Sequence, residues 1–119
     1  MRGKIYQPTI TASANIQKMH QGLIFYAKEG NSVHSISPGK VVFADRLTGY
    51  GLLMIIDHGW GFMSLYGNNS KLLKNVGTYV AANEEIAKIG HSGVLQKNGL
   101  YFEIRHNGKT LPPLTWLQH

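Results

Sequence analysis

The sequence predicts an all-β domain, built as an antiparallel β-sandwich or barrel. Fourteen glycines punctuate the chain. From Gly22 onward neighbouring glycines are never more than about a dozen residues apart, a spacing that helices of ordinary length do not tolerate. Short runs rich in β-branched and aromatic residues fill the intervals, which is typical of strands. Only Asn69–Lys74 could hold a helical turn.

Length and composition describe one globular domain. The chain has 119 residues, of which 43% are hydrophobic and 15% charged, so it can bury a core without disulfide or metal supports. We expect one domain over residues 1–119 with its core at about 20–117. No apolar run approaches the ~20 residues that cross a bilayer. No secretion signal follows Met1, so we expect that an exported protein would contain this chain as a cut-out domain.

Charge and cysteine content exclude several classes of function. The formal net charge is +6. Cysteine is absent, and its absence excludes a disulfide framework, cysteine zinc sites and cysteine nucleophiles. The lysines and arginines are scattered along the chain and form no basic cluster, so we expect no nucleic-acid partner.

The predicted strands follow one another between the glycines. Leu52–Ile56 is apolar on both parities, which indicates a central strand with both faces covered. The glycine-rich turn at 57–61 then predicts a hairpin into the next strand. Prolines exclude the tail from a central strand, and Trp116 and Leu117 are expected to close over one end of the core. The predicted strands are Gly22–Ala27, Ser32–Ile36, Lys40–Ala44, Leu52–Asp57, Phe62–Tyr66, Ile86–Ile89 and Leu100–Arg105.

The last predicted strand carries two different faces. Its period of two places Leu100, Phe102 and Ile104 on the core. Tyr101, Glu103 and Arg105 then lie on the opposite face, in a row that offers a ring, a carboxylate and a guanidinium. The strand alone allows two equally good interpretations of this face. It is either an ordinary solvent-exposed face with an ion pair or a binding site.

The residues taken individually indicate no assembled catalytic site. The chain has six histidines, but no His-x-His or His-Glu-x-x-His pattern that would place two zinc ligands on one face. No serine lies in a Gly-x-Ser-x-Gly turn, and no glycine loop resembles a phosphate-binding loop. We therefore expect no metal and no cofactor.

Several motifs together resemble the LytM or lysostaphin-type zinc endopeptidases. The resemblance runs from about Gly22 to Leu117, and it rests on the order and spacing of the motifs. It implies an antiparallel β-fold with a groove across one sheet. The motifs are Gly30-Asn31-Ser32-Val33, Ile36-x-x-Gly39-Lys40-Val41-Val42, Gly49-Tyr50-Gly51-Leu52 with Ile56-Asp57-His58-Gly59, Leu65-Tyr66-Gly67, Val76-Gly77-x-x-Val80, Ile86-Ala87-x-x-Gly90 and Leu100–Arg105.

The chain departs from active members at the zinc site. Active members carry His-x-Gly-x-Asp, and here His20 remains while Ile24 replaces the aspartate. They carry His-x-His before Phe-Glu, where this chain has Gly99 and Tyr101. Asn68 stands where a further catalytic histidine is usual. One of three zinc ligands is left, and a single imidazole does not hold zinc against water. The resemblance therefore implies a non-enzymatic domain.

Within this family, the chain resembles the EnvC-like degenerate LytM proteins. The run 100–105, Tyr50-Gly51 and the Trp116-Leu117 ending carry this similarity. It implies a periplasmic activator of zinc-dependent N-acetylmuramoyl-L-alanine amidases, which cleave peptidoglycan at cell division. It also implies an upstream coiled coil, absent from this chain, that would engage a division ABC transporter.

The same resemblance implies a set of residues that bind the partner. We expect them to capture the helix that blocks the amidase's own active site. Gln21 departs from the basic residue of well-known relatives, and Leu53 is equally well interpreted as core. Open alternatives are an active zinc endopeptidase using His20, a passive peptidoglycan-binding module and a structural scaffold. The expected partner-binding residues are Gln21, Ile24, Tyr50, Leu53, Tyr101, Glu103 and Arg105.

Overall fold

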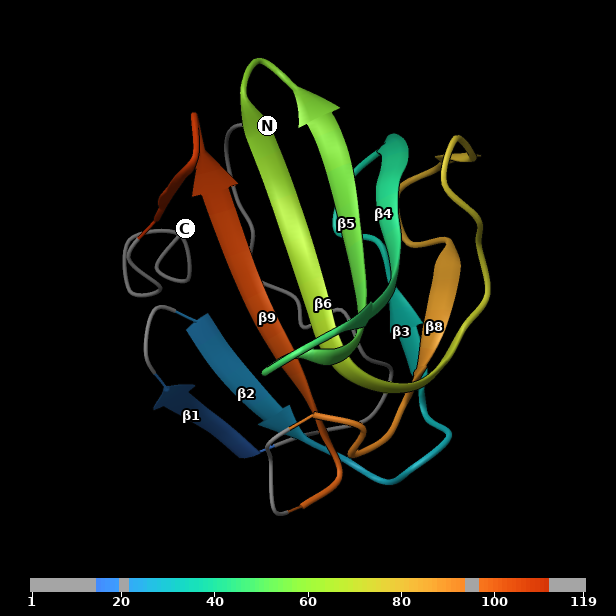
Figure 1. Ribbon diagram of the computed structural model, residues 1–119, viewed down its shortest axis with the longest axis vertical. Coiled ribbons are helices and arrows are strands. Elements are labelled where there is room, and N and C mark those ends of the chain that lie inside the picture. The colour runs from blue at the N-terminus through green and yellow to red at the C-terminus, as the bar shows by residue number, and fades with distance from the viewer. Residues whose placement is uncertain (1–14, 20–21, 94–96, 112–119) are drawn as a thin grey trace.

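The computed structural model describes residues 15–19, 22–93 and 97–111. In these segments the chain is all-β, as predicted, and Figure 1 shows the arrangement of its strands. None of the described residues form a helix of the length and apolarity that crossing a membrane requires. The strands are β1 (Asn15–Met19), β2 (Gly22–Tyr26), β3 (Ser32–His34), β4 (Gly39–Leu47), β5 (Gly51–Gly59), β6 (Phe62–Leu72), β7 (Tyr79–Val80), β8 (Glu85–Ile89), β9 (Gly99–His106) and β10 (Lys109–Thr110).

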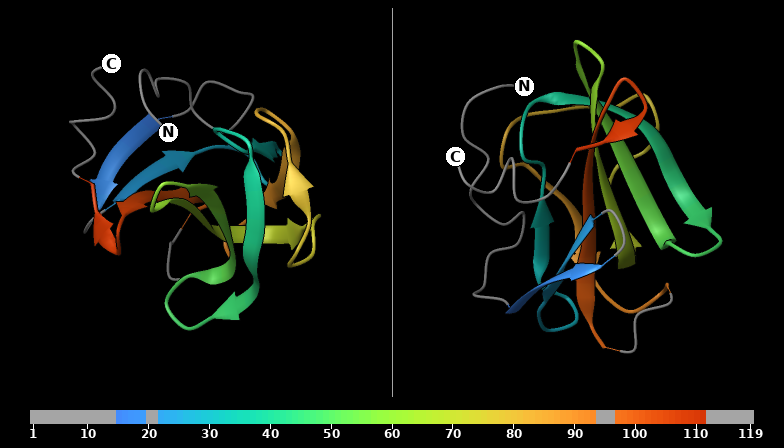
Figure 2. Two further views of the ribbon diagram at one scale, coloured as in Figure 1. Left: turned by 90° about the horizontal axis from the view of Figure 1, so that it is seen from above. Right: turned by 90° about the vertical axis from the view of Figure 1, so that its left-hand side faces the viewer.

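The ten strands of the described residues form one antiparallel sheet, in which seven of them follow the order β1-β2-β9-β6-β5-β4-β7. The long strand β6 connects the main row of strands with the β3–β8 pair. Its residues Phe62–Gly67 pair with β9, and its residues Asn69–Leu72 pair with β8. β8 in turn pairs with β3, and β10 pairs with β9. Figure 2 shows that the sheet is strongly curved, so β3 and β8 lie across from the central strands. β5 lies between β4 and β6, which confirms the predicted central strand.

Of two local expectations, one is wrong and the other falls outside the described residues. The helical turn expected at Asn69–Lys74 is wrong, because β6 continues through Leu72 and pairs there with β8. A bulge between Asn69 and Lys71 interrupts this pairing. The expected closure by Trp116 and Leu117 lies outside the described residues.

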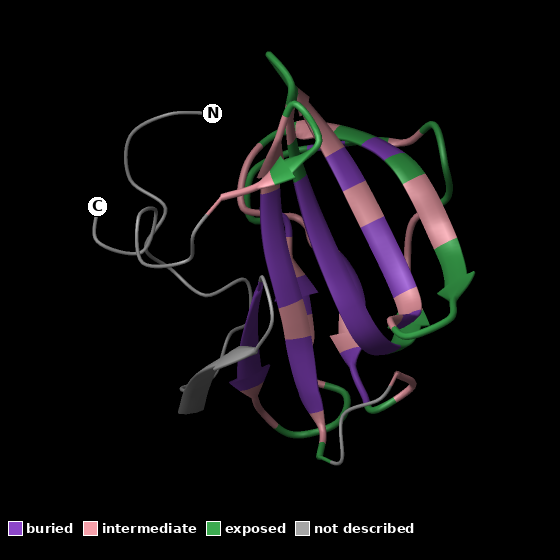
Figure 3. Ribbon diagram, turned by 60° about the vertical axis from the view of Figure 1, so that its left-hand side comes forward, coloured by how far each residue is buried: buried purple, intermediate pink, exposed green. Residues whose placement is uncertain are grey.

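The hydrophobic core fills the space inside the curved sheet. On β9 the predicted period of two is confirmed, because Leu100, Phe102 and Ile104 are buried in the core. The Phe102 ring meets the Phe25 and Tyr66 rings with centroids 6.2 and 5.3 Å apart. Burial of each such side chain contributes roughly 2 kcal/mol. Figure 3 shows that the central strands are buried along most of their length.

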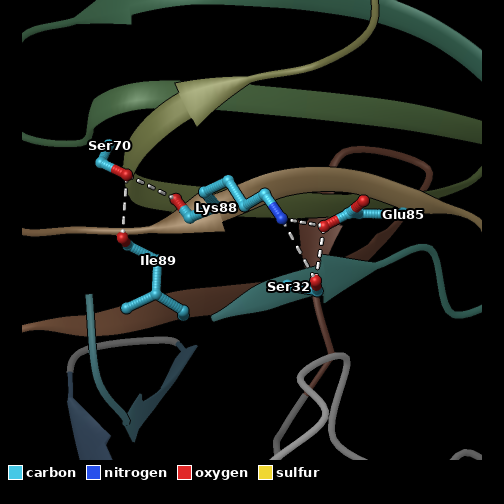
Figure 4. A network of polar contacts seen from close by, with 5 residues as sticks. All are labelled: Ser32, Ser70, Glu85, Lys88 and Ile89. Atoms are coloured by element: carbon cyan, nitrogen blue, oxygen red, sulfur yellow. Dashed lines mark hydrogen bonds and ion pairs between the residues drawn. The ribbon is translucent and has the colours of Figure 1, made fainter. Parts of the chain in front are cut away.

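A polar network joins β3 to β8 and β8 to β6 (Figure 4). Ser32 Oγ donates to Glu85 Oε2 at 2.5 Å, and Lys88 Nζ donates to the same oxygen at 2.5 Å. The hydrogen bonds from Lys88 and Ser32 lower the pKa of Glu85. Ser70 Oγ on β6 donates to the carbonyl oxygen of Ile89 at 2.9 Å. These contacts hold β8 in place and leave its apolar side chains to the core.

Two neighbouring hairpins end in tight turns at the same end of the sheet. The β5–β6 turn has φ values of 57° at Trp60 and 82° at Gly61, and the β9–β10 turn has 52° at Asn107 and 82° at Gly108. Positive φ at both central residues of a two-residue loop is the type I′ arrangement, which matches the twist of paired strands. Asn107 N donates to the Gly61 carbonyl oxygen at 2.8 Å, so the two turns are joined.

Candidate functional site

The face of β9 that points away from the core continues across its neighbouring strands. Tyr101 lies opposite Ile24 on β2 and opposite Gly67 on β6. Directly opposed residues of an antiparallel pair share one face of the sheet. Glu103 is opposite Leu65, and Arg105 is opposite Met63, in the same way. We call this surface the Tyr101 face, and it consists of Ile24, Tyr50, Leu53, Met63, Leu65, Tyr101, Glu103 and Arg105.

Four predicted site residues form a closed ring of contacts on this face. The Tyr101 hydroxyl donates to Glu103 Oε2. Glu103 Oε1 accepts a hydrogen bond of 3.0 Å from Arg105 Nε. Arg105 Nη2 donates to the Tyr50 hydroxyl at 3.4 Å. The Tyr50 and Tyr101 rings meet edge to face at 5.7 Å and 62°. We call these four residues the Tyr50–Arg105 cluster.

The cluster surrounds a buried carboxylate. The Glu103 side chain is only 2% exposed, whereas that of Arg105 is 34% exposed. A buried carboxylate is costly unless it is paired and hydrogen-bonded, and Arg105 and Tyr101 supply those contacts. Burial opposes the charge on Arg105, but the hydrogen bond and charge of Glu103 outweigh it and raise the Arg105 pKa. Arg105 therefore presents a permanent positive charge at the surface.

Tyr101 is held as a neutral phenol. Burial raises its pKa, and the hydrogen bond and charge of Glu103 raise the pKa further. Ionisation would remove the proton that Tyr101 gives to Glu103 and would place two negative charges side by side. At neutral pH the ring thus offers apolar area and a hydroxyl, and it offers no phenolate.

Two predicted partner-binding residues lie beneath the surface, and one cannot be placed. Ile24 and Leu53 are each 1% exposed, and neither belongs to the main core cluster. They are thus buried members of the Tyr101 face and expose almost no side-chain surface to a partner. Their role toward a partner stays a prediction. Gln21, like the relic position His20, lies outside the described residues.

Two residues of this face were not among the predicted site residues. Met63 and Leu65 on β6 stand opposite Arg105 and Glu103, and Met63 is 36% exposed while Leu65 is buried. The neighbouring residue Tyr66 is also apolar and lies in the core. Because apolar or aromatic residues occupy both odd and even positions of β6, the sequence does not show which side chains share a face. The register of β6 with β9 shows it.

Asn68, which the resemblance implies stands at a lost catalytic position, has a structural task. It is fully buried at φ 69°, a conformation that asparagine tolerates better than most residues. Its Nδ2 donates to the carbonyl oxygens of Gly90 and Gly99 at 2.9 and 2.8 Å. Its Oδ1 accepts from Gly93 N at 2.8 Å, and its own N–H donates to the Tyr50 carbonyl oxygen at 2.7 Å. Asn68 thereby positions Tyr50.

The described residues at the zinc-site positions that the resemblance implies do not fit a zinc ion. Zinc in proteins takes imidazole, thiolate or carboxylate ligands. Ile24 offers no donor atom, and the Tyr101 hydroxyl is committed to Glu103. The Asn68 amide is used in full by backbone groups. Among the described residues no group of three histidine, cysteine, aspartate or glutamate side chains could hold a metal ion. We therefore derive no chemical step through zinc.

Comparison with known proteins identifies relatives of this fold. Residues 18–113 match the model of Peptidase family M23. The chain is 45% identical over 97 residues to the Escherichia coli murein hydrolase activator EnvC, covering 82% of this chain and 23% of EnvC. It is 34% identical over 99 residues to the Salmonella typhimurium murein hydrolase activator NlpD, covering 82% of this chain and 26% of NlpD. The chain thus spans about a quarter of these relatives.

Solved structures give the same result. The catalytic domain of the antimicrobial peptidase lysostaphin from Staphylococcus simulans superposes with a TM-score of 0.78 at 28% identity, covering 98% of this chain and 91% of that domain. A peptidase M23 structure from Pseudomonas aeruginosa superposes with a TM-score of 0.81 at 21% identity, which supports the fold. The resemblance to LytM and lysostaphin-type domains is confirmed, and the chain belongs to Peptidase family M23.

Proposed function

We propose that this chain is a non-catalytic activator of periplasmic zinc-dependent N-acetylmuramoyl-L-alanine amidases, which cleave peptidoglycan at cell division. The Tyr50–Arg105 cluster carries the proposal. Its Tyr101 stands where the resemblance implies a lost zinc ligand, and Tyr101, Glu103 and Arg105 hydrogen-bond to groups within the chain. EnvC and NlpD, which are 45% and 34% identical to this chain over 97 and 99 residues, are named murein hydrolase activators.

The cluster is suited to hold a helix of the partner. Tyr50 and Tyr101 present two fixed aromatic rings in mutual contact, and such side chains are enriched at interface hot spots. The part-exposed guanidinium of Arg105 uses Nε for Glu103 and Nη2 for Tyr50. Its remaining N–H groups can donate to a carboxylate or to the carbonyl end of a helix. We expect the buried side chains of Ile24 and Leu53 to form the apolar floor of the groove.

Activation then follows from a difference in affinity. The amidase interconverts between a form whose own helix blocks its zinc site and a form in which that helix is free. A surface that binds the free helix shifts the amidase toward the open form, and only by its preference for that form. This chain therefore supplies binding energy, while the amidase's metal performs the hydrolysis.

The test measures release of dye from labelled cell walls by candidate amidases with increasing amounts of the purified chain. Tyr101→Ala and Arg105→Ala should each raise the concentration needed for half-maximal stimulation by about 30-fold or more, as expected for hot-spot residues. Tyr79→Ala is the matched control, because Tyr79 is an exposed tyrosine on the far edge strand β7. It should leave stimulation unchanged.

Three results would remove the proposal. Unchanged stimulation by both Tyr101→Ala and Arg105→Ala would exclude the Tyr101 face. Dye release by the chain without amidase would indicate the alternative, an active endopeptidase. Co-sedimentation with cell walls without effect on any amidase would indicate a passive peptidoglycan-binding module.

A further inference from the structure

The tip of the β5–β6 hairpin carries a side chain that turn geometry does not favour. Trp60 has φ 57° at the first central position of the turn. That position of a type I′ turn favours asparagine, aspartate or glycine, whereas a bulky side chain there is strained. The Trp60 side chain is 87% exposed. It adds nothing to the core and leaves a large apolar surface in water.

The adjacent hairpin provides an internal reference. The β9–β10 turn has nearly the same two φ values, and there the sequence is Asn107-Gly108, the preferred pair for this turn. The two turns are in contact, since Asn107 N donates to the Gly61 carbonyl oxygen at 2.8 Å and a Cβ on Gly61 would collide with the Asn107 side chain. The Phe62 ring stacks on His106 at 4.1 Å. Trp60 is thus presented from a fixed backbone, and stability alone does not account for it.

The tip continues the Tyr101 face along the same strands. Met63 lies opposite Arg105 and is 36% exposed, and the turn follows within three residues. At ~3.3 Å per residue, Tyr101 to Arg105 spans about 13 Å and Met63 to the tip about 10 Å more. An α-helix of about 15 residues covers that distance.

We propose that Trp60 is a second anchor for the same partner helix, which rests on the function proposed above. The helix segment that lies on Tyr50 and Tyr101 continues past Arg105 and Met63, and an apolar side chain at its far end packs on the Trp60 indole. An aromatic side chain buries roughly 150–250 Å² in such a contact, and tryptophan is the residue most typical of interface hot spots.

The surroundings of the tip favour a protein partner over a membrane. Stable attachment to an anionic membrane needs a group of basic and apolar side chains. Here the flanking residues Gly59 and Gly61 have no side chains, and the Asp57 carboxylate accepts from Gly59 N at 2.9 Å beside the tip. The continuity with Met63 and Arg105 points along the Tyr101 face instead.

The test exchanges Trp60 for the residue that the turn favours. Trp60→Asn should raise the Tm of the chain by roughly 2–5 °C, because asparagine adopts positive φ at lower cost. The same variant should raise the concentration for half-maximal amidase stimulation by about tenfold. Stability and function would then move in opposite directions, which no general loss of folding can imitate. Trp60→Phe should retain most of the wild-type affinity, and Tyr79→Asn should change nothing.

The outcomes separate this inference from the proposed function. If the wild-type chain stimulates no amidase, the proposed function fails and the second anchor fails with it. If the wild-type chain stimulates and the Trp60→Asn titration superimposes on it, the second anchor alone is overturned. It is likewise overturned if Trp60→Asn loses binding to anionic lipid vesicles or to isolated cell walls while its half-maximal concentration stays at the wild-type value.

Discussion

The two faces of β9 differ in how far the stability of the fold explains their residues. On one face Leu100, Phe102 and Ile104 are buried and apolar, and they contact other apolar side chains of the core. On the other face the alternate residues bury a carboxylate and enclose it with an arginine and two tyrosines. Apolar residues of similar volume at such a place are often neutral or stabilising. The core face is therefore explained by folding, whereas the Tyr101 face requires a functional reason.

The largest expected effect contrasts the two faces directly. Phe102→Ala should lower the free energy of unfolding by about 3–5 kcal/mol, because it empties a fully packed position between Phe25 and Tyr66. Tyr101→Ala, one residue away on the half-buried face, should cost at most about 2 kcal/mol. Urea unfolding followed by circular dichroism measures both. Equal losses for the two variants would mean that the faces do not differ as described.

A smaller effect separates stability from function within the cluster. Arg105→Ala should lower the free energy of unfolding by about 1–3 kcal/mol, since it leaves the Glu103 carboxylate buried with only Tyr101 as a partner. The double variant Glu103→Leu, Arg105→Met should recover most of that loss and still fail to stimulate an amidase. A double variant as unstable as Arg105→Ala would show that the ion pair stabilises the fold.

The smallest expected effect comes from a polar chain on the core side of β6. His58 Nδ1 donates to the Pro38 carbonyl oxygen at 2.8 Å, and Nε2 lies 2.6 Å from Ser64 Oγ. Ser64 Oγ is in turn 2.7 Å from the Tyr66 hydroxyl. Burial raises the pKa of Tyr66 to about 12. Burial also lowers the pKa of His58, and outweighs the opposite effect of its hydrogen bond to Pro38.

This lowered pKa predicts a pH dependence of stability. Since folded His58 has a pKa below the value of 6.5 for a free imidazole, the unfolded chain takes up the proton first as the pH falls. The stability that depends on neutral His58 is complete above about pH 6.5 and is lost progressively below it. Thermal unfolding should show a larger fall in Tm between pH 7 and pH 5 for the wild type than for His58→Gln. Parallel curves would contradict this role of His58.

The sequence allowed the fold to be predicted where local pattern and environment agree. The alternation in Leu100–Arg105 and the doubly apolar run Leu52–Ile56 gave the correct strands and faces. The expectation at Asn69–Lys74 failed because pairing between β6 and β8 overrides local preference there.

The sequence pattern predicted only part of the candidate site. Tyr101, Glu103 and Arg105 follow from the period of one strand, but Tyr50 comes from a turn 55 residues before Arg105 and was named through family resemblance alone. The task of Asn68 depends on contacts to Gly90 and Gly99, which are distant in sequence. No local pattern contains such information.

Methionine methyl groups offer the most direct test of where the partner binds. Met63 lies part-exposed on the Tyr101 face, whereas Met54 is buried in the core behind it. In a chain labelled at its methionine methyls, addition of a stimulated amidase should shift or broaden the NMR signal of Met63 and leave that of Met54 in place. Stimulation with an unperturbed Met63 signal would contradict the account, because the partner would then bind elsewhere on the domain.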